Sequence, residues 1–346
     1  LPLPAQETAA QPALPPAPPT PVPAPAAPPR RTGTRWFAIA GGLLALVVIG
    51  TAAFALLRGP SSGTSTQATS AAVQPLPASA GALDPAVADV IAKAAQQLDA
   101  GDTGGAMETL KPALEARPDD PNLLALRGIA NLSNSGPDAA HADIDRALSL
   151  APNNALVYFA RGYVNQRTDR PDDAIADYSK AIELDATFAR AYYQRSILMG
   201  YPKNDPASLR RDLDRTIELE PAYVPARMDR AWLLYHASQE AQALADLEQV
   251  FSTDASNSAA PRLRGLIYAR QGKTDDARRD FAAAVAAAPD DGGIRRDEFD
   301  FLVRQRDFEK ALADADKLVA LNETDPESYT LRGFGQHARG RDEQAL

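Results

Sequence analysis

The chain has 346 residues, with 36 basic and 45 acidic side chains and no cysteine. The absence of cysteine excludes disulfides, thiolate metal sites and cysteine nucleophiles, and it is compatible with an oxidising compartment. The net charge of −9 argues against nucleic acid as a partner, because phosphate binding requires a basic surface.

Residues 1–35 form a segment rich in proline and alanine that ends in basic residues. This composition favours extended polyproline II and cannot build a core, so we expect a disordered, semi-rigid spacer. A ligand for a proline-binding module is the alternative interpretation.

An apolar segment without any charge runs from Trp36 to Leu57. Its 22 residues, at about 1.5 Å each, would span roughly 33 Å, close to the thickness of a bilayer core. The segment therefore predicts a single transmembrane helix. A cleaved signal peptide and a buried soluble helix are the alternatives. The segment is long and starts late for a signal peptide, and it lacks the polar face of a surface-packed helix.

Three arginines precede this segment and one follows it directly, so the positive-inside rule places the N-terminus in the cytoplasm. Residues 58–86, rich in Gly, Ser, Thr, Ala and Pro, have the composition of a flexible linker. The rest of the chain would then lie outside the cytoplasm.

A unit of about 34 residues recurs from residue 87 onward, and residues 155–188 show it most clearly. Apolar residues at helical spacing on both sides of a polar break at Thr168–Asp173 predict two amphipathic helices. A small residue recurs at the eighth position, and another recurs in the first turn of the second helix. The first set is Ala94, Gly128, Gly162, Ser196, Ala231, Gly265 and Gly333, and the second is Ala106, Ala140, Ala174, Ala243, Ala277, Ala311 and Ala345.

This pattern resembles the tetratricopeptide repeat family, whose signature places small residues where the two helices touch, aromatic residues in the gaps and proline at the joins. The resemblance implies an all-α fold, an α-solenoid of about seven and a half repeats over residues 87–346, whose surface can serve many binding functions. The expected units are 87–120, 121–154, 155–188, 189–223, 224–257, 258–291, 292–325 and a partial unit over 326–346. The partial unit leaves open whether the sequence is a fragment or another element covers the final apolar face.

Two units depart from the pattern, and we expect local distortion in both. The 189–223 unit carries one extra residue in a loop of turn formers and has Leu209 in place of a small residue. The 292–325 unit has Phe299 where the other units have a small residue.

An arginine before the small eighth residue and an aspartate 16 residues later recur together, with an offset of 17 in the unit with the insertion. The arginines are Arg127, Arg161, Arg195, Arg230, Arg264 and Arg332, and the aspartates are Asp143, Asp177, Asp212, Asp246, Asp280 and Asp314. We predict an Arg–Asp ladder between the first and second helices, with a ligand-binding role for the arginines as the alternative. Glu298 replaces the arginine in the 292–325 unit, which should leave Asp314 without that partner.

No catalytic constellation is recognisable, and we predict no enzymatic activity, no metal and no cofactor. The three histidines, His141, His236 and His337, fall in different units. The GDTGG sequence at 101–105 lacks the Lys-Ser/Thr of a phosphate loop. Aspartate pairs at turns predict helix caps rather than calcium ligands; these are Asp119/Asp120, Asp172/Asp173, Asp275/Asp276 and Asp290/Asp291.

The family resemblance implies that the first helix of each unit lines a concave face. Carried over by phase, this face concentrates aromatic residues, methionine and arginine, which dominate binding hot spots. The predicted binding residues are Phe159, Tyr163, Arg167, Arg190, Tyr193, Tyr201, Met228, Trp232, Tyr235, Arg262 and Arg270, accompanied by Leu156, Gln166, Ile197, His236 and Leu266. Packing between helices is the alternative role. The two-carboxylate clamp of chaperone-binding family members is not recognisable at the matching positions.

We therefore expect a membrane-anchored scaffold that binds a peptide or protein segment in the groove of the solenoid. Aromatic residues would anchor that segment, while Arg190, Arg262 and Arg270 would meet its acidic or carbonyl groups. Few lysines among many Ala, Arg and Asp residues suggest a bacterial cell envelope protein, with the repeats in the periplasm. Two alternatives remain: the recruiting portion of a larger membrane enzyme, and an assembly factor for polysaccharide or outer-membrane protein export.

Overall fold

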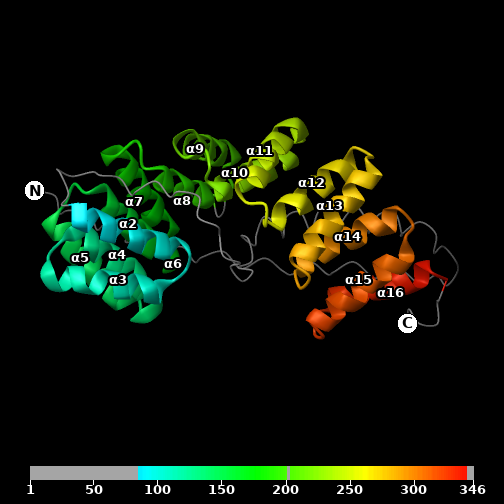
Figure 1. Cartoon of the computed structure of the whole chain (residues 1–346), viewed down its shortest axis with the longest axis horizontal. Coiled ribbons are helices and arrows are strands. Elements are labelled where there is room, and N and C mark those ends of the chain that lie inside the picture. Colours follow the sequence, from blue (N-terminus) through cyan, green and yellow to red (C-terminus); the bar gives the residue numbers. More distant parts are fainter. Residues whose placement is uncertain (1–84, 201–202, 341–346) are drawn as a thin grey trace, which may run out of the picture. The chain divides into compact units, whose positions relative to one another are not determined.

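The structure is a computed structural model that describes residues 85–200 and 203–340. Within these ranges it contains fifteen α-helices and no strand, which confirms the all-α prediction (Figure 1). The helices are α2 (Pro85–Asp99), α3 (Thr103–Ala116), α4 (Pro121–Asn134), α5 (Pro137–Leu150), α6 (Ala155–Arg167), α7 (Pro171–Leu184), α8 (Ala189–Gly200), α9 (Pro206–Leu219), α10 (Val224–His236), α11 (Glu240–Thr253), α12 (Ala259–Arg270), α13 (Thr274–Ala287), α14 (Gly292–Arg304), α15 (Phe308–Leu321) and α16 (Pro326–Ala338).

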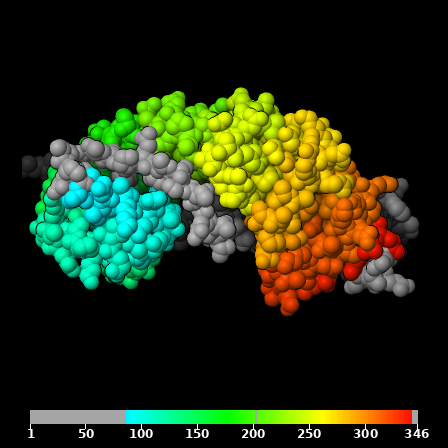
Figure 2. Space-filling view, viewed as in Figure 1, coloured from blue at the N-terminus to red at the C-terminus, as the bar shows by residue number. Residues whose placement is uncertain are grey.

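The described helices form a solenoid of helix-turn-helix pairs, from α2/α3 to α14/α15, followed by α16. The two helices of each pair pack on each other, and each second helix packs against the first helix of the next pair. Figure 2 shows the pairs in chain order, from cyan at α2 to orange at α15. First helices also contact one another directly, at α2–α4, α4–α6, α10–α12 and α12–α14. Each pair therefore buries its apolar face against its neighbours.

Aspartates at the turns act on the helix starts in two ways. Asp120 and Asp291 each accept two backbone N–H hydrogen bonds at the starts of α4 and α14, which confirms their predicted capping role. Asp172/Asp173 and Asp275/Asp276 lie in the first turns of α7 and α13, where no side chain caps the helix. Those carboxylates face the positive end of the helix dipole instead of capping a backbone group.

The Arg–Asp ladder is confirmed in five units, where each guanidinium donates from Nε and Nη2 to both carboxylate oxygens. The pairs are Arg127–Asp143, Arg161–Asp177, Arg195–Asp212, Arg230–Asp246 and Arg264–Asp280. The aspartates are buried, whereas the arginine side chains are 21–34% exposed. A fork of this geometry fixes the orientation of the two helices of a pair.

The ladder changes at Glu298 in α14. Asp314 lacks the ladder arginine, as expected, but Arg295 takes its place, with Nη1 3.0 Å from Asp314 Oδ1. The second oxygen of Asp314 is buried and has no hydrogen-bond partner in the described part of the chain. Burial raises the pKa of Asp314 to about 6, and burial together with the Asp314 charge raises the pKa of Glu298 to about 7.

Phe299 fits into its unit because the large and the small residue of the helix–helix contact have changed places between the two helices. In the 155–188 unit, Gly162 lies against the ring of Tyr178, and a Cβ added at this glycine would be 2.9 Å from the ring. The 292–325 unit reverses the arrangement, because Phe299 and Ala315 occupy the equivalent positions and both are buried. The helix α14 is continuous through Phe299, so the distortion expected there is not found. Volume is conserved across the contact.

The unit with the extra residue shows a related exchange at the end of α8. Leu209 of α9 lies over Gly200, where an added Cβ would be 3.1 Å from Leu209 Cδ2. The direct contacts between first helices are weaker on both sides of α8 than at α4–α6 or α10–α12. The departure from the repeat pattern in this unit therefore coincides with a weaker junction along the row of first helices.

The predicted transmembrane segment Trp36–Leu57 lies outside the described residues, as do the spacer and most of the linker. In the ranges 85–200 and 203–340, no helix combines the length and apolar character required to cross a bilayer.

Candidate functional site

The predicted binding residues lie on the first helices α6, α8, α10 and α12, except Tyr201, which is outside the described residues. We call the surface formed by these predicted residues the first-helix face. Their surroundings differ along the chain, because some fill gaps in the core and others form partly exposed clusters.

On α6, packing accounts for much of the aromatic surface. The ring of Phe159 lies 5.7 Å from that of Tyr178 and 4.9 Å from that of Phe188. Tyr163 is partly buried, and the exposed Arg167 lies 5.5 Å above its ring. Phe159 therefore packs against rings of its own unit, while Tyr163 and Arg167 present a cation–π pair to solvent.

On α8, Arg190 is held by groups of the protein itself. Its Nη1 lies 2.6 Å from Asp99 at the end of α2, its Nε lies 3.6 Å from Glu220, and its guanidinium covers the ring of Tyr223 at 4.5 Å. The Arg190 side chain is only 13% exposed. Asp99 belongs to the first unit and Arg190 to the fourth, so this contact links two units that are separated by two others.

Tyr193, also on α8, reaches the next unit. Its hydroxyl donates to Asp229 Oδ2 of α10 at 3.0 Å, and its ring meets that of Tyr223 edge-on at 5.0 Å. Burial raises the pKa of Asp229 to about 6, and the hydrogen bond from Tyr193 partly opposes the shift. This carboxylate has no ion-pair partner in the described part of the chain.

On α10, Trp232 forms a cluster with two rings of its own helix. It meets Tyr235 edge-on at 5.9 Å and stacks on His236 at 5.9 Å. Burial and the nearby Arg270 lower the pKa of His236, so this ring is neutral near pH 7. Met228, by contrast, is a core residue at 8% exposure.

The two arginines predicted on α12 are already paired. Arg262 Nε lies 2.6 Å from Asp297 of α14, and the Arg262 guanidinium lies 5.6 Å from the Trp232 ring centroid. Arg270 lies 3.9 Å above the ring of Tyr235, donates to the Tyr235 carbonyl at 3.0 Å and is 3.6 Å from Glu240.

Sequence reasoning missed the acidic residues of this surface. Asp229 and Asp297 stand at the sixth position of their units, where Leu126, Ala160 and Leu263 stand in other units. An aspartate at a position where other units have an apolar residue could have indicated these acidic residues from the sequence. The partner of Arg190 gave no such signal, because Asp99 is remote in the sequence.

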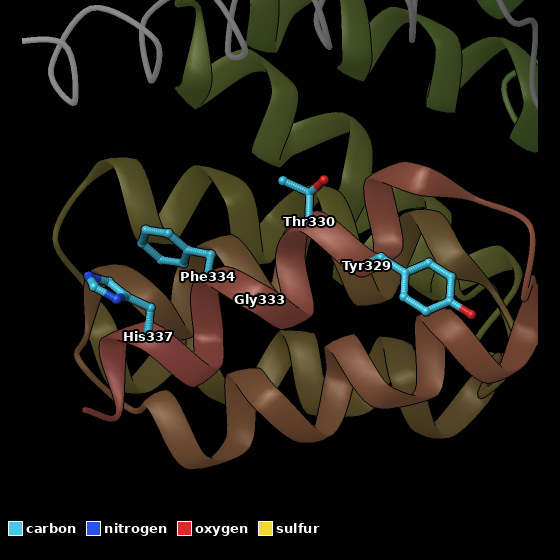
Figure 3. Close-up of a pocket in the computed structure, with 5 residues that line it drawn as sticks. All are labelled: Tyr329, Thr330, Gly333, Phe334 and His337. Carbon is cyan, nitrogen blue, oxygen red and sulfur yellow. The ribbon is translucent and has the colours of Figure 1, made fainter. Parts of the chain in front are cut away.

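A further surface depression lies on α16, lined by Tyr329, Thr330, Gly333, Phe334 and His337 (Figure 3). Tyr329 and Phe334 are exposed at 42% and 43%. Gly333 corresponds to the glycines that receive the second helix in earlier units. Within the described residues, no group of three or more His, Asp or Glu side chains is arranged to hold a metal ion.

A family model described as tetratricopeptide repeat matches residues 126–187 and 228–292. Among solved structures, the Cut9–Hcn1 heterotetramer of the APC/C matches with a TM-score of 0.60 and 11% identity, over 71% of this chain and 48% of that one. The match thus spans about half of that chain. Pseudomonas aeruginosa pilF matches with a TM-score of 0.50 and 19% identity, over 60% of this chain and 93% of that one. Comparison with curated proteins gives no significant match. At these identities the structural matches establish the fold alone.

Proposed function

We propose that this chain, which matches the tetratricopeptide repeat family over residues 126–187 and 228–292, is a membrane-anchored scaffold that binds a peptide or protein segment on its first-helix face. Protein–protein interaction is the role that the repeat fold suggests. The anchor would be the apolar segment Trp36–Leu57, with the solenoid on the far side of the membrane from the cytoplasm.

The observation that carries this proposal is the partly exposed aromatic cluster of α10, formed by Trp232, Tyr235 and His236. Phe159 and Met228 have packing roles, so they contribute to the scaffold more than to a contact surface. A rigid aromatic cluster supplies large contact area at little entropic cost, which is how anchors of interfaces work.

The test compares two double variants of the full chain in a pull-down from detergent-solubilised membranes. The pair Trp232→Ala and Tyr235→Ala removes the cluster, and we expect it to lose the captured partner. The control pair, Tyr192→Ala and Tyr268→Ala, removes rings of first helices that lie beside ladder arginines. Helix content by circular dichroism checks that both variants fold. Equal partner recovery with the cluster variant and the control would contradict binding at this face.

Membrane topology is tested separately, with reporter fusions at the two ends of the chain. We expect a cytoplasmic N-terminal reporter and a C-terminal reporter on the opposite side. Reporters on the same side would contradict a single membrane crossing.

A further inference from the structure

The charges of the first-helix face leave its three central arginines with intramolecular partners. Arg190 is paired with Asp99, Arg262 with Asp297, and Arg270 lies near Glu240 while donating to a backbone carbonyl. An acidic ligand would have to break these ion pairs before it could use the guanidinium groups. Breaking them would uncover carboxylates that repel the same ligand.

Carboxylates on the same surface are less completely matched. Among the described residues, Asp229 accepts a hydrogen bond from the Tyr193 hydroxyl alone. Asp300 of α14 is exposed and has neither a hydrogen bond nor an ion pair in the described part of the chain. The arginines of α10 and α12 are thus all paired, whereas Asp300 is offset only in part by the charge of Arg304, one turn further along α14.

These groups form one continuous array across three neighbouring first helices. Asp229 precedes Trp232 by one helical turn on α10, Arg262 of α12 lies over the Trp232 ring, and the same arginine pairs with Asp297 of α14. Asp300 follows Asp297 by one turn on α14. An extended segment lying across these helices would meet an aromatic cluster with a carboxylate on either side.

We propose that the α10–α14 face, defined by Asp229, Trp232, Tyr235, Arg262, Asp297 and Asp300, binds a partner segment that carries lysine or arginine next to an aromatic or aliphatic residue. The inference rests on the proposed function and specifies the chemistry of its partner. The apolar residue packs on the Trp232 cluster, and the cation pairs with Asp300 or Asp229. This charge is opposite to the one expected from the arginines in the sequence.

The acid strengths of the free carboxylates support the same polarity. Partial desolvation and the charges of Asp297 and Glu327 raise the pKa of Asp300 to about 6 although Arg304 opposes the shift, and burial raises the pKa of Asp229 to about 6. A bound cation stabilises the ionised form of each carboxylate, which burial disfavours in the free protein. Affinity for a basic segment should fall as the pH drops through about 6, because both carboxylates become neutral.

The experiment uses the full chain in detergent micelles with Trp36→Phe, so that Trp232 is the sole tryptophan. Three peptides of equal length share their leucine and phenylalanine positions and carry lysine, glutamine or glutamate elsewhere. Trp232 emission reports binding. We expect the lysine peptide to bind tightest and the glutamate peptide weakest, with about three- to tenfold between neighbouring members of the series.

Two variants locate the effect. Asp300→Asn should lower the affinity for the lysine peptide about threefold or more and leave that for the glutamine peptide unchanged. The control, Asp316→Asn, removes an exposed carboxylate of α15 and should change neither. Equal binding of all three peptides, tightest binding of the glutamate peptide, or an unchanged lysine-peptide affinity in Asp300→Asn would overturn the assignment while leaving the binding face in place. A Trp232 emission that responds to none of the peptides would instead contradict the proposed function.

Discussion

The Arg161–Asp177 pair allows the energetic role of the ladder to be worked out from its geometry. Arg161 Nη2 lies 2.6 Å from Asp177 Oδ1, its Nε lies 3.0 Å from both carboxylate oxygens, and Asn165 adds a hydrogen bond of 2.8 Å. Asp177 is 7% exposed in its side chain and Arg161 is 32% exposed. Removing the arginine therefore leaves a buried carboxylate with one amide donor.

The expected magnitude lies between two limits. Breaking a fully buried ion pair costs about 3–5 kcal/mol, and an exposed pair contributes about 0–1 kcal/mol. Because one-third of Arg161 reaches solvent, we expect Arg161→Ala to cost about 2–3 kcal/mol and the coupling energy with Asp177 to be about 1–2 kcal/mol.

A double-mutant cycle of Arg161→Ala and Asp177→Ala, followed by urea unfolding and circular dichroism, measures this coupling. The chain offers a matched control in Arg146–Asp119, an ion pair of 3.0 Å whose side chains are 54% and 59% exposed. The control cycle should give less than about 1 kcal/mol. A coupling for the ladder pair no larger than that of the control would refute the reasoning.

Three further predictions concern the contact between the two helices of a unit. Burial and the charge of Asp314 raise the pKa of Glu298 to about 7, so the folded state holds a proton that the unfolded state loses near pH 4.5. The free energy of unfolding should therefore fall as the pH rises from about 4.5 to 7. Urea titrations across this range should show a weaker pH dependence for Glu298→Gln than for the native chain. Gly162→Ala should destabilise, because its Cβ would lie 2.9 Å from a buried ring, whereas Gly265→Ala, at 3.4 Å, should be neutral or stabilise by up to about 1 kcal/mol in the same assay. Phe299→Ala should cost about 3–5 kcal/mol, and an enlarged residue 16 positions later should restore part of the loss, as thermal unfolding of the double variant would show.

Much of the fold could be predicted because the repeats provide internal comparison. The constant offset between Arg161 and Asp177, repeated in other units, predicted a physical contact that the structure confirms. The contact between Phe299 and Ala315 could also have been predicted from the sequence, because a large residue at one of the two repeat positions accompanies a small residue at the other. This contact becomes visible only when the two helices of one unit are compared with each other, because the repeat pattern aligns equivalent positions of different units.

The candidate site was less predictable, because its contacts join different units. Repeat phase placed Arg190 and Arg262 on the first helices but could not supply their partners. The Asp99–Arg190 contact depends on how four successive units stack, and the Arg262–Asp297 contact depends on the junction between α12 and α14. The arginines alone predicted a positively charged surface for a ligand, whereas Asp99 and Asp297 neutralise that charge.

The most direct test of the central claim places a photo-crosslinking amino acid at position 232 of the full chain, in membranes of the cells that produce it. The matched control places the same group at Glu248, an exposed position on the second helix α11. If the first-helix face is the binding surface, a partner should be crosslinked from position 232 and none from position 248. Crosslinking from position 248 alone, or equally from both positions, would contradict it.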